Sequence, residues 1–277
     1  MQTINCNGKL FDLSTPRVMG IINVTPDSFY DGGMTVASEA ILKQAGKMLS
    51  EGASILDIGG YSSRPGASSV SEADELHRVL PAIETILAEF PDAILSIDTF
   101  RASVAKQAVM KGAAIVNDIS GGRLDDTMYH TVSQLGVPYI LMHMRGTPQT
   151  MTQETNYDDV TREVLFYFSE RLALARAAGI NDIIADPGFG FAKTRQQSFE
   201  LLNHLEQFQS LEIPYLAGVS RKSMVYKSLD STPEDALNGT TALNTVALLK
   251  GASILRVHDV KEAVECITLV HNLKSKP

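Results

Sequence analysis

The chain lacks tryptophan, and only two of its 277 residues are cysteines. Cys6 and Cys266 lie far apart, and neither belongs to a pair with metal-ligand spacing. A disulfide framework or a structural zinc site is therefore not expected, which favours a reducing compartment. The N-terminus has no charged-then-apolar signal pattern, and no apolar run is long enough to cross a bilayer. We therefore expect a soluble cytoplasmic protein without a membrane partner.

Basic residues are in the minority, with 24 Lys and Arg against 32 Asp and Glu, a net charge of −8. An acidic surface argues against a nucleic-acid or anionic-membrane partner. A small anionic substrate stays possible, because local basic groups can outweigh the net charge. No low-complexity linker divides the sequence, so we expect one domain over residues 1–277.

Short apolar runs alternate with longer amphipathic stretches, a pattern typical of a parallel α/β sheet covered by helices. Strands are expected at Arg17–Asn23, 54–58, 93–98, 114–118, 138–143, 182–186, 215–220 and 253–258. Helices are expected at 36–51, 71–90, 101–111, 125–135, 157–179, 195–210, 233–250 and 259–273. Residues 2–13 could form a short hairpin that closes one end of the fold.

Several helix ends carry the expected markers. Ser71 with Asp74 three residues later indicates a capped helix start. Glycines that can adopt a left-handed backbone follow five of the helical patterns. They are Gly52, Gly112, Gly136, Gly179 and Gly251.

Eight βα units could form a closed (β/α)8 TIM barrel or an open doubly wound sheet. No GxGxxG turn follows the first strand, and polar residues end nearly every strand. A barrel gathers such residues at its C-terminal mouth, so we predict the barrel.

The residues at these strand ends are chemically varied. They are Asn23, Asp57, Asp98, Asn117, Asp118, His143, Asp186, Ser220, Lys222, Arg256 and His258. We expect Asp118, and also Asp259, which follows the last of these residues, to have only structural roles. Burying the whole set at one end would be costly without pairing or a ligand, so a polar ligand site is the better interpretation.

The side-chain types suggest the ligand. Asp98, Asn117 and Asp186 offer acceptors to a donor-rich heterocycle, Lys222 offers donors to its other edge, and Arg256 can stack on a flat ring. His258, Arg64 and Ser63 offer donors to an anion, and the Asn23 oxygen suits Mg²⁺. Two long loops, 23–33 and 61–67, are either lids over the site or solvated connections.

The ordered motifs resemble the dihydropteroate synthase family of pterin-binding enzymes. They are Asn23-Val-Thr-Pro-Asp-Ser-Phe-Tyr-Asp-Gly-Gly33, Asp57-Ile-Gly-Gly60, Ser63-Arg-Pro-Gly66, Ser96-Ile-Asp98, Val116-Asn-Asp-Ile119, Met142-His-Met144, Asp186-Pro-Gly-Phe-Gly-Phe191, Ser220-Arg-Lys-Ser-Met224 and Arg256-Val-His258. The resemblance implies that 4-aminobenzoate displaces pyrophosphate from 6-hydroxymethyl-7,8-dihydropterin pyrophosphate, through a pterin cation. It also implies Mg²⁺ as cofactor and a homodimer.

The resemblance assigns roles to individual residues. It implies a pterin pocket formed by Asp98, Asn117, Met142, Asp186, Phe191, Gly218, Lys222 and Arg256. It places Asn23, Ser63, Arg64, Arg256 and His258 at the pyrophosphate, with Mg²⁺ at Asn23. It places Phe29, Pro65 and Ser223 at 4-aminobenzoate, and it implies catalytic roles for Asp31, Arg64, Lys222 and His258.

Some points stay open. Asp57 could act in the reaction, or only fix Lys222 or a loop. Tyr61 stands where the family usually has Glu, and Ser63 where it usually has Thr; Tyr61 puts the anchoring of its loop in question. A pterin-binding methyltransferase domain and a catalytically silent paralogue are the rival interpretations.

Overall fold

The computed structural model describes residues 3–24, 33–61 and 70–274. Eight parallel strands form one sheet: β3 (Arg17–Asn23), β4 (Ile55–Gly59), β5 (Leu95–Asp98), β6 (Ile115–Asp118), β7 (Tyr139–Met142), β8 (Ile183–Asp186), β9 (Leu216–Ala217) and β10 (Ile254–Val257). Their order is β8-β7-β6-β5-β4-β3-β10-β9, and an Ala185–Tyr215 bridge brings the two edges together. The sheet is a nearly closed barrel, as the sequence predicts.

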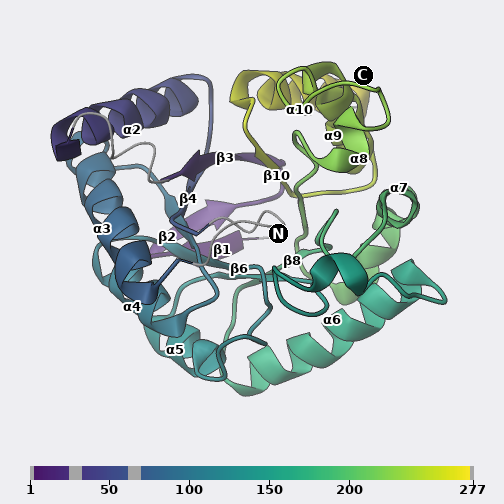
Figure 1. The fold of residues 1–277 in the computed structure, drawn as a ribbon, viewed down its shortest axis with the longest axis horizontal. Helices are drawn as coiled ribbons and strands as arrows, with labels where there is room; N and C mark the ends of the chain where they lie inside the picture. Colours follow the sequence, from purple (N-terminus) through teal and green to yellow (C-terminus); the bar gives the residue numbers. More distant parts are fainter. Residues whose placement is uncertain (1–2, 25–32, 62–69, 275–277) are drawn as a thin grey trace.

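Helices surround the barrel on the outside (Figure 1). They are α2 (Gly33–Ser50), α3 (Glu72–Glu89), α4 (Ala102–Met110), α5 (Met128–Leu135), α6 (Val160–Ala177), α7 (Arg195–Asn203), α8 (Ser223–Tyr226), α9 (Leu237–Leu249) and α10 (Val260–Lys274). Two 3-10 helices, Met151–Gln153 and Leu205–Leu211, are also present. None of the described helices has the length and apolar character that crossing a membrane requires.

The start of α3 shows how local sequence sets a boundary. The Ser71 side chain accepts a hydrogen bond from the Asp74 backbone N–H, which confirms the predicted cap. Val79, Ile83 and Ile86 recur at helical spacing and are fully buried against the barrel. The five glycines predicted to end helices all have a positive φ.

The expected helix 195–210 is wrong in its second half. The α-helix ends at Asn203, His204 leaves the helical conformation, and a 3-10 helix follows over Leu205–Leu211. Leu205 and Phe208 are both buried there, and a spacing of three residues places side chains on one face of a 3-10 helix. The core therefore selects the tighter helix.

The inside of the barrel is filled from its N-terminal end. Strands β1 (Thr3–Cys6) and β2 (Lys9–Asp12) pair antiparallel and lie across the centre of the barrel in Figure 1. Ile4 and Cys6 join a buried cluster with Met19, Ile55 and other strand residues. Cys6 and Cys266 are both free and buried. The opposite, C-terminal end is left for polar side chains.

Candidate active site

Polar side chains from neighbouring strands meet at the C-terminal end of the barrel. Strand register places Asp98 of β5 beside Asn117 of β6, and Met142 of β7 beside Asp186 of β8. Asp57 lies on β4 and Arg256 on β10, on the other side of β3. The parallel barrel thus gathers side chains that are far apart in the sequence.

Arg256 is the centre of the first half of the site. Its Nε donates to Asp57 Oδ2 and its NH2 group donates to Asp98 Oδ2, both at 2.7 Å. Asn117 Nδ2 also donates to Asp57 Oδ2, at 2.9 Å. Burial lowers the pKa of Arg256, but the charges of Asp57 and Asp98 outweigh it and raise that pKa above its usual value. The pairing uses the edge of the guanidinium, which leaves its flat face as a stacking surface.

Asp57 is fully buried, and its hydrogen bonds within the described part of the chain do not include Lys222. They go to Arg256 and Asn117, so Asp57 fixes these two side chains rather than Lys222. Its second oxygen, Oδ1, has no hydrogen-bond partner among the described residues. A buried carboxylate oxygen without a partner is costly, and the bonds of Oδ2 to Arg256 and Asn117 offset that cost.

Asp98 has an unusual protonation equilibrium. Burial raises the pKa of its carboxyl to about 7; the neighbouring charge of Asp57 adds to this, while Arg256 opposes it. Asp98 therefore changes its charge close to neutral pH.

Lys222 and Asp186 form the second half of the site. The Lys222 ammonium donates to the Phe189 carbonyl at 2.6 Å and lies 4.7 Å from the centre of the Phe191 ring. Burial lowers the pKa of Lys222 to about 8, although Asp186 opposes this shift. Burial raises the pKa of Asp186, and Lys222 opposes that change in turn. The two groups thus stabilise each other's charged form.

Gly218 lies between the two halves. A Cβ atom there would lie 3.9 Å from both Arg256 Cβ and Lys222 Nζ. These are ordinary contact distances, so Gly218 lies directly against both cationic side chains.

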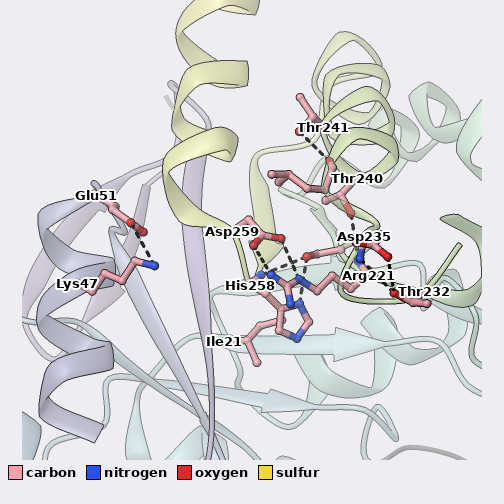
Figure 2. A network of polar contacts seen from close by, with 12 residues as sticks. Ile21, Lys47, Glu51, Arg221, Thr232, Asp235, Thr240, Thr241, His258 and Asp259 are labelled. Carbon is pink, nitrogen blue, oxygen red and sulfur yellow. Dashed lines mark hydrogen bonds and ion pairs between the residues drawn. The ribbon is translucent and has the colours of Figure 1, made fainter. Parts of the chain in front are cut away.

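The segment that carries Lys222 is tied to the end of β10 by two adjacent contacts. Ser220 Oγ lies 3.1 Å from His258 Nδ1, and Arg221 forms a two-point ion pair with Asp259 at 2.5 and 3.1 Å. Figure 2 shows Arg221 reaching Asp259 next to His258. Arg221 has a φ of +54°, a conformation that a non-glycine residue rarely adopts. The ion pair holds this turn, so Asp259 has the structural role that the sequence suggested.

Asp118 likewise has a structural role. It is fully buried and accepts hydrogen bonds from the Ser120 backbone and hydroxyl, the Gly122 backbone and the Tyr139 hydroxyl. These partners fix the loop after β6 and leave Asp118 outside the chemistry.

Asn23 ends β3 and is exposed. A Cβ built on Gly59 would lie 3.8 Å from Asn23 Oδ1 and 3.8 Å from Asp98 Oδ2, so the amide faces the site. Within residues 3–24, 33–61 and 70–274, no group of three or more His, Cys, Asp or Glu side chains could hold a metal ion.

Several predicted site residues lie outside the described residues. These are Phe29, Asp31, Ser63, Arg64 and Pro65. Ser223 is described, and it is the first residue of α8, with Lys222 as the residue that precedes the helix. Met142 and Phe191 pack in one small apolar cluster at this end of the barrel.

Tyr61 is well anchored although it replaces the acidic residue usual at this position. Its ring packs edge-on against Phe100 at 5.1 Å, and the Arg101 guanidinium lies 5.6 Å from the ring centre. Its hydroxyl accepts a hydrogen bond from Gln149 Nε2 at 2.9 Å. Arg101 finds its carboxylate partner in the buried Glu75 instead. These contacts anchor the Tyr61 side chain.

The sequence did not reveal the role of Lys193. This lysine is 7% exposed, and its ammonium contacts His143 Nδ1 at 2.8 Å and the carbonyls of Gly188 and Phe191 at 3.0 Å. A lysine in a loop is usually solvated, so nothing in its sequence context indicates that it is buried.

Comparison with known proteins adds to this geometry. Residues 19–258 match the sequence profile of the family described as pterin binding enzyme. Dihydropteroate synthase from Escherichia coli K12 is 43% identical over 265 residues, which cover 95% of this chain and 93% of the relative. Two structures of dihydropteroate synthase from Xanthomonas albilineans superpose closely. The one with 4-aminobenzoic acid has a TM-score of 0.92 at 40% identity, covering 99% of each chain. The one in complex with 7,8-dihydropteroate has a TM-score of 0.89 at 38% identity, covering 99% of this chain and 100% of the other.

Proposed function

Because the chain belongs to the dihydropteroate synthases, within the pterin-binding enzyme family, we propose that it joins 6-hydroxymethyl-7,8-dihydropterin pyrophosphate to 4-aminobenzoate. The products are 7,8-dihydropteroate and pyrophosphate. The observation that carries the proposal is the convergence of Asp98, Asn117 and Asp186 with Lys222 and Arg256 at one end of the barrel. The similar structures with 4-aminobenzoic acid and with 7,8-dihydropteroate support it.

Recognition of the pterin follows from the side chains present. Its amino group and ring N–H groups donate to Asp98, Asn117 and Asp186, and its carbonyl and ring nitrogens accept from Lys222. The Arg256 guanidinium stacks on the ring while its edge stays bonded to Asp57 and Asp98. Met142, Phe191 and Gly218 line the pocket.

The reaction replaces one bond by another. The bond between the exocyclic carbon of the pterin and the pyrophosphate oxygen breaks, and its electron pair leaves with pyrophosphate. The amine nitrogen of 4-aminobenzoate forms the new carbon–nitrogen bond and releases a proton. His258, Arg64 and Ser63 stabilise the departing negative charge, and Asp31 stabilises the cation that remains on the pterin. Phe29 and Pro65 contact the 4-aminobenzoate ring, and Ser223 receives its carboxylate.

Asn23 is our proposed protein ligand for Mg²⁺. Its exposed amide oxygen is a hard ligand, and pyrophosphate oxygens and waters would complete the coordination. When bound, Mg²⁺ would neutralise negative charge on the leaving pyrophosphate. The contribution of the chain is to hold that oxygen beside Asp98 at the mouth of the barrel.

Steady-state measurement of pyrophosphate release tests the function. We expect release from the pterin pyrophosphate only when both 4-aminobenzoate and Mg²⁺ are present, with 7,8-dihydropteroate formed in equal amount. A pterin-binding methyltransferase domain or a silent paralogue would bind pterin and release no pyrophosphate in this way. Release that does not depend on 4-aminobenzoate would contradict the proposal.

We further propose a cytoplasmic homodimer, as the family resemblance implies. Leu249, Leu269 and Leu273 support it, because these α9 and α10 side chains are 47%, 69% and 73% exposed, whereas Leu248 faces the core. Exposed leucines on neighbouring helices favour an interface where they form one contiguous apolar patch. Light scattering should give the mass of two chains for the native protein and of one chain for Leu269→Lys with Leu273→Lys. A monomeric native protein would refute the dimer.

A further inference from the structure

The loop after β8 carries two groups that hold Lys222. Its Phe189 carbonyl accepts the Lys222 hydrogen bond at 2.6 Å, and its Phe191 ring lies 4.7 Å from the same ammonium. The Gly188 backbone N–H also donates to Asp186 Oδ1 at 2.8 Å. The geometry of residues 188–191 therefore sets the position of both Lys222 and Asp186.

This loop has an unusual backbone. Gly188 and Gly190 have φ values of +69° and +78°, and Ala192 has +48° although it is not a glycine. A Cβ on Gly188 would lie 2.2 Å from the His143 carbonyl oxygen, so only glycine permits the close approach to the residue after β7. Such a conformation persists only where surrounding contacts hold it.

Lys193 supplies these contacts. Its ammonium donates to the Gly188 and Phe191 carbonyls at 3.0 Å each, on either side of Phe189. Its third hydrogen bond is to His143 Nδ1 at 2.8 Å, which anchors the loop to the end of β7. A lysine ammonium has three donors, so these partners satisfy it fully.

The environment of this lysine is otherwise unfavourable. Burial lowers the pKa of Lys193 well below its usual value, and the charge of Asp186 opposes that shift. Burial also lowers the pKa of His143, with Lys193 adding to the effect. Because an ammonium can only donate, His143 Nδ1 accepts this hydrogen bond. Burying a lysine ammonium costs more free energy than burying an apolar side chain, so an apolar contact would brace the loop at a lower cost.

We propose that Lys193 is a positioning residue for pterin recognition, which fixes the Gly188–Phe191 turn and through it places Lys222 and Asp186. This inference rests on the proposed function, because it concerns the same pocket. It adds a residue that acts through two backbone carbonyls of this loop.

The test compares variants by calorimetry with 6-hydroxymethyl-7,8-dihydropterin, which reports the ring contacts alone. Lys193→Met keeps the length of the side chain and removes all three donors. We expect its dissociation constant for the pterin to rise about 10- to 100-fold, by analogy with the loss of buried hydrogen bonds to charged groups. The KM for 4-aminobenzoate at saturating pterin pyrophosphate should change less than about threefold, because Lys193 has no contact with Ser223.

Ser198→Ala is the matched control. Ser198 Oγ accepts a hydrogen bond from the Gly190 backbone at 3.2 Å, so it braces the same loop without contacting the carbonyls of Gly188 or Phe191. We expect its pterin affinity to stay within about threefold of the native protein. A second variant, His143→Phe, keeps an aromatic ring against Tyr167 and removes one of the three partners of Lys193, so it should weaken pterin binding to a smaller extent.

A double-mutant cycle with Lys222→Met separates positioning from stability. If Lys193 acts through Lys222, the combined loss of pterin affinity should be clearly smaller than the sum of the single losses. A lower melting temperature with unchanged pterin affinity in both Lys193→Met and His143→Phe would overturn the inference. An equal rise of the dissociation constant for the pterin and of the KM for 4-aminobenzoate would overturn it as well. A native protein that binds no pterin at all would refute the proposed function instead.

Discussion

At the scale of single residues, the site depends on charges that are buried and paired. Arg256 bonds to Asp57 and Asp98, and Lys222 lies in the field of Asp186. Each carboxylate opposes the loss of charge that burial would impose on its cation. A donor-rich heterocycle would add hydrogen bonds to carboxylates that are already held in place, which is the preorganised state that favours tight binding.

The Asp186→Ala variant tests the pterin edge directly. It removes the acceptor for the ring donors and should weaken pterin binding by about 1–3 kcal/mol, since those donors would be buried without partners. Calorimetry on folded protein measures this, with circular dichroism as the control for folding. Normal affinity combined with lower stability would mean that Asp186 only supports the turn at Gly188.

Pterin affinity should show a bell-shaped pH dependence. Below about pH 7 Asp98 becomes protonated and loses an acceptor, because burial raises its pKa. Above about pH 8 Lys222 loses its proton and a donor, because burial lowers its pKa. The affinity should therefore be highest between these values and about tenfold weaker one pH unit outside each of them.

Two variants assign the limbs of this profile. Asp98→Asn should bind more weakly and lose the acid limb, and Lys222→Met should lose the basic limb. Calorimetric titrations across the pH range give both curves. An acid limb that persists in Asp98→Asn would show that another group controls it.

At the scale of elements, much of the barrel could be predicted from the sequence. Arg17–Asn23 has the predicted bounds because an uninterrupted apolar run ended by asparagine matches a buried strand. The strand expected at 215–220 is regular only over Leu216–Ala217, because the chain turns at Arg221 to bring Lys222 into the site. That turn depends on the ion pair between Arg221 and Asp259. The two residues are distant in the sequence, so no local pattern predicts their contact.

Some features of the candidate site could likewise be predicted from the sequence, and others could not. Asp98, Asn117 and Asp186 could be found because each ends an apolar run. The bonds of Arg256 to Asp57 and Asp98, and the burial of Lys193, could not be found. They depend on which strands become neighbours and on how a loop folds back.

Gly136 and Gly188 both have a positive φ but differ in the space around them, so they allow a matched comparison of alanine substitutions. Gly136 ends α5 with φ +65°, and nothing lies within 4 Å of a Cβ built there. Gly136→Ala should therefore cost only the left-handed conformation, about 1–2 kcal/mol. Gly188→Ala has the same conformational cost plus a clash with the His143 carbonyl, so it should be less stable and lose pterin affinity. Urea denaturation and calorimetry measure the two effects, and equal losses of stability would contradict this account.

At the scale of the whole molecule, the two ends of the barrel have different tasks. The β1–β2 hairpin packs Ile4 and Cys6 into the N-terminal end, and the polar residues occupy the opposite end. Barrel enzymes keep chemistry at the C-terminal face, so the N-terminal end is free to serve stability alone.

Ile4→Ala tests this separation. Ile4 is 3% exposed, so its truncation should lower the free energy of unfolding by about 2–5 kcal/mol. The kcat and both KM values should stay unchanged at a temperature where the variant is folded. A selective change in either KM would show that the hairpin influences the site.

The central claim is that the strand ends form one pterin pocket, and a crystal structure of the chain with bound 7,8-dihydropteroate tests it most directly. We predict that the pterin edge lies within hydrogen-bond distance of Asp98, Asn117 and Asp186. Arg256 should stack on the ring, and the benzoate end should lie near Ser223. Product bound elsewhere would contradict the account, for example in the groove of about 330 Å³ lined by Arg145, Arg162 and Phe166.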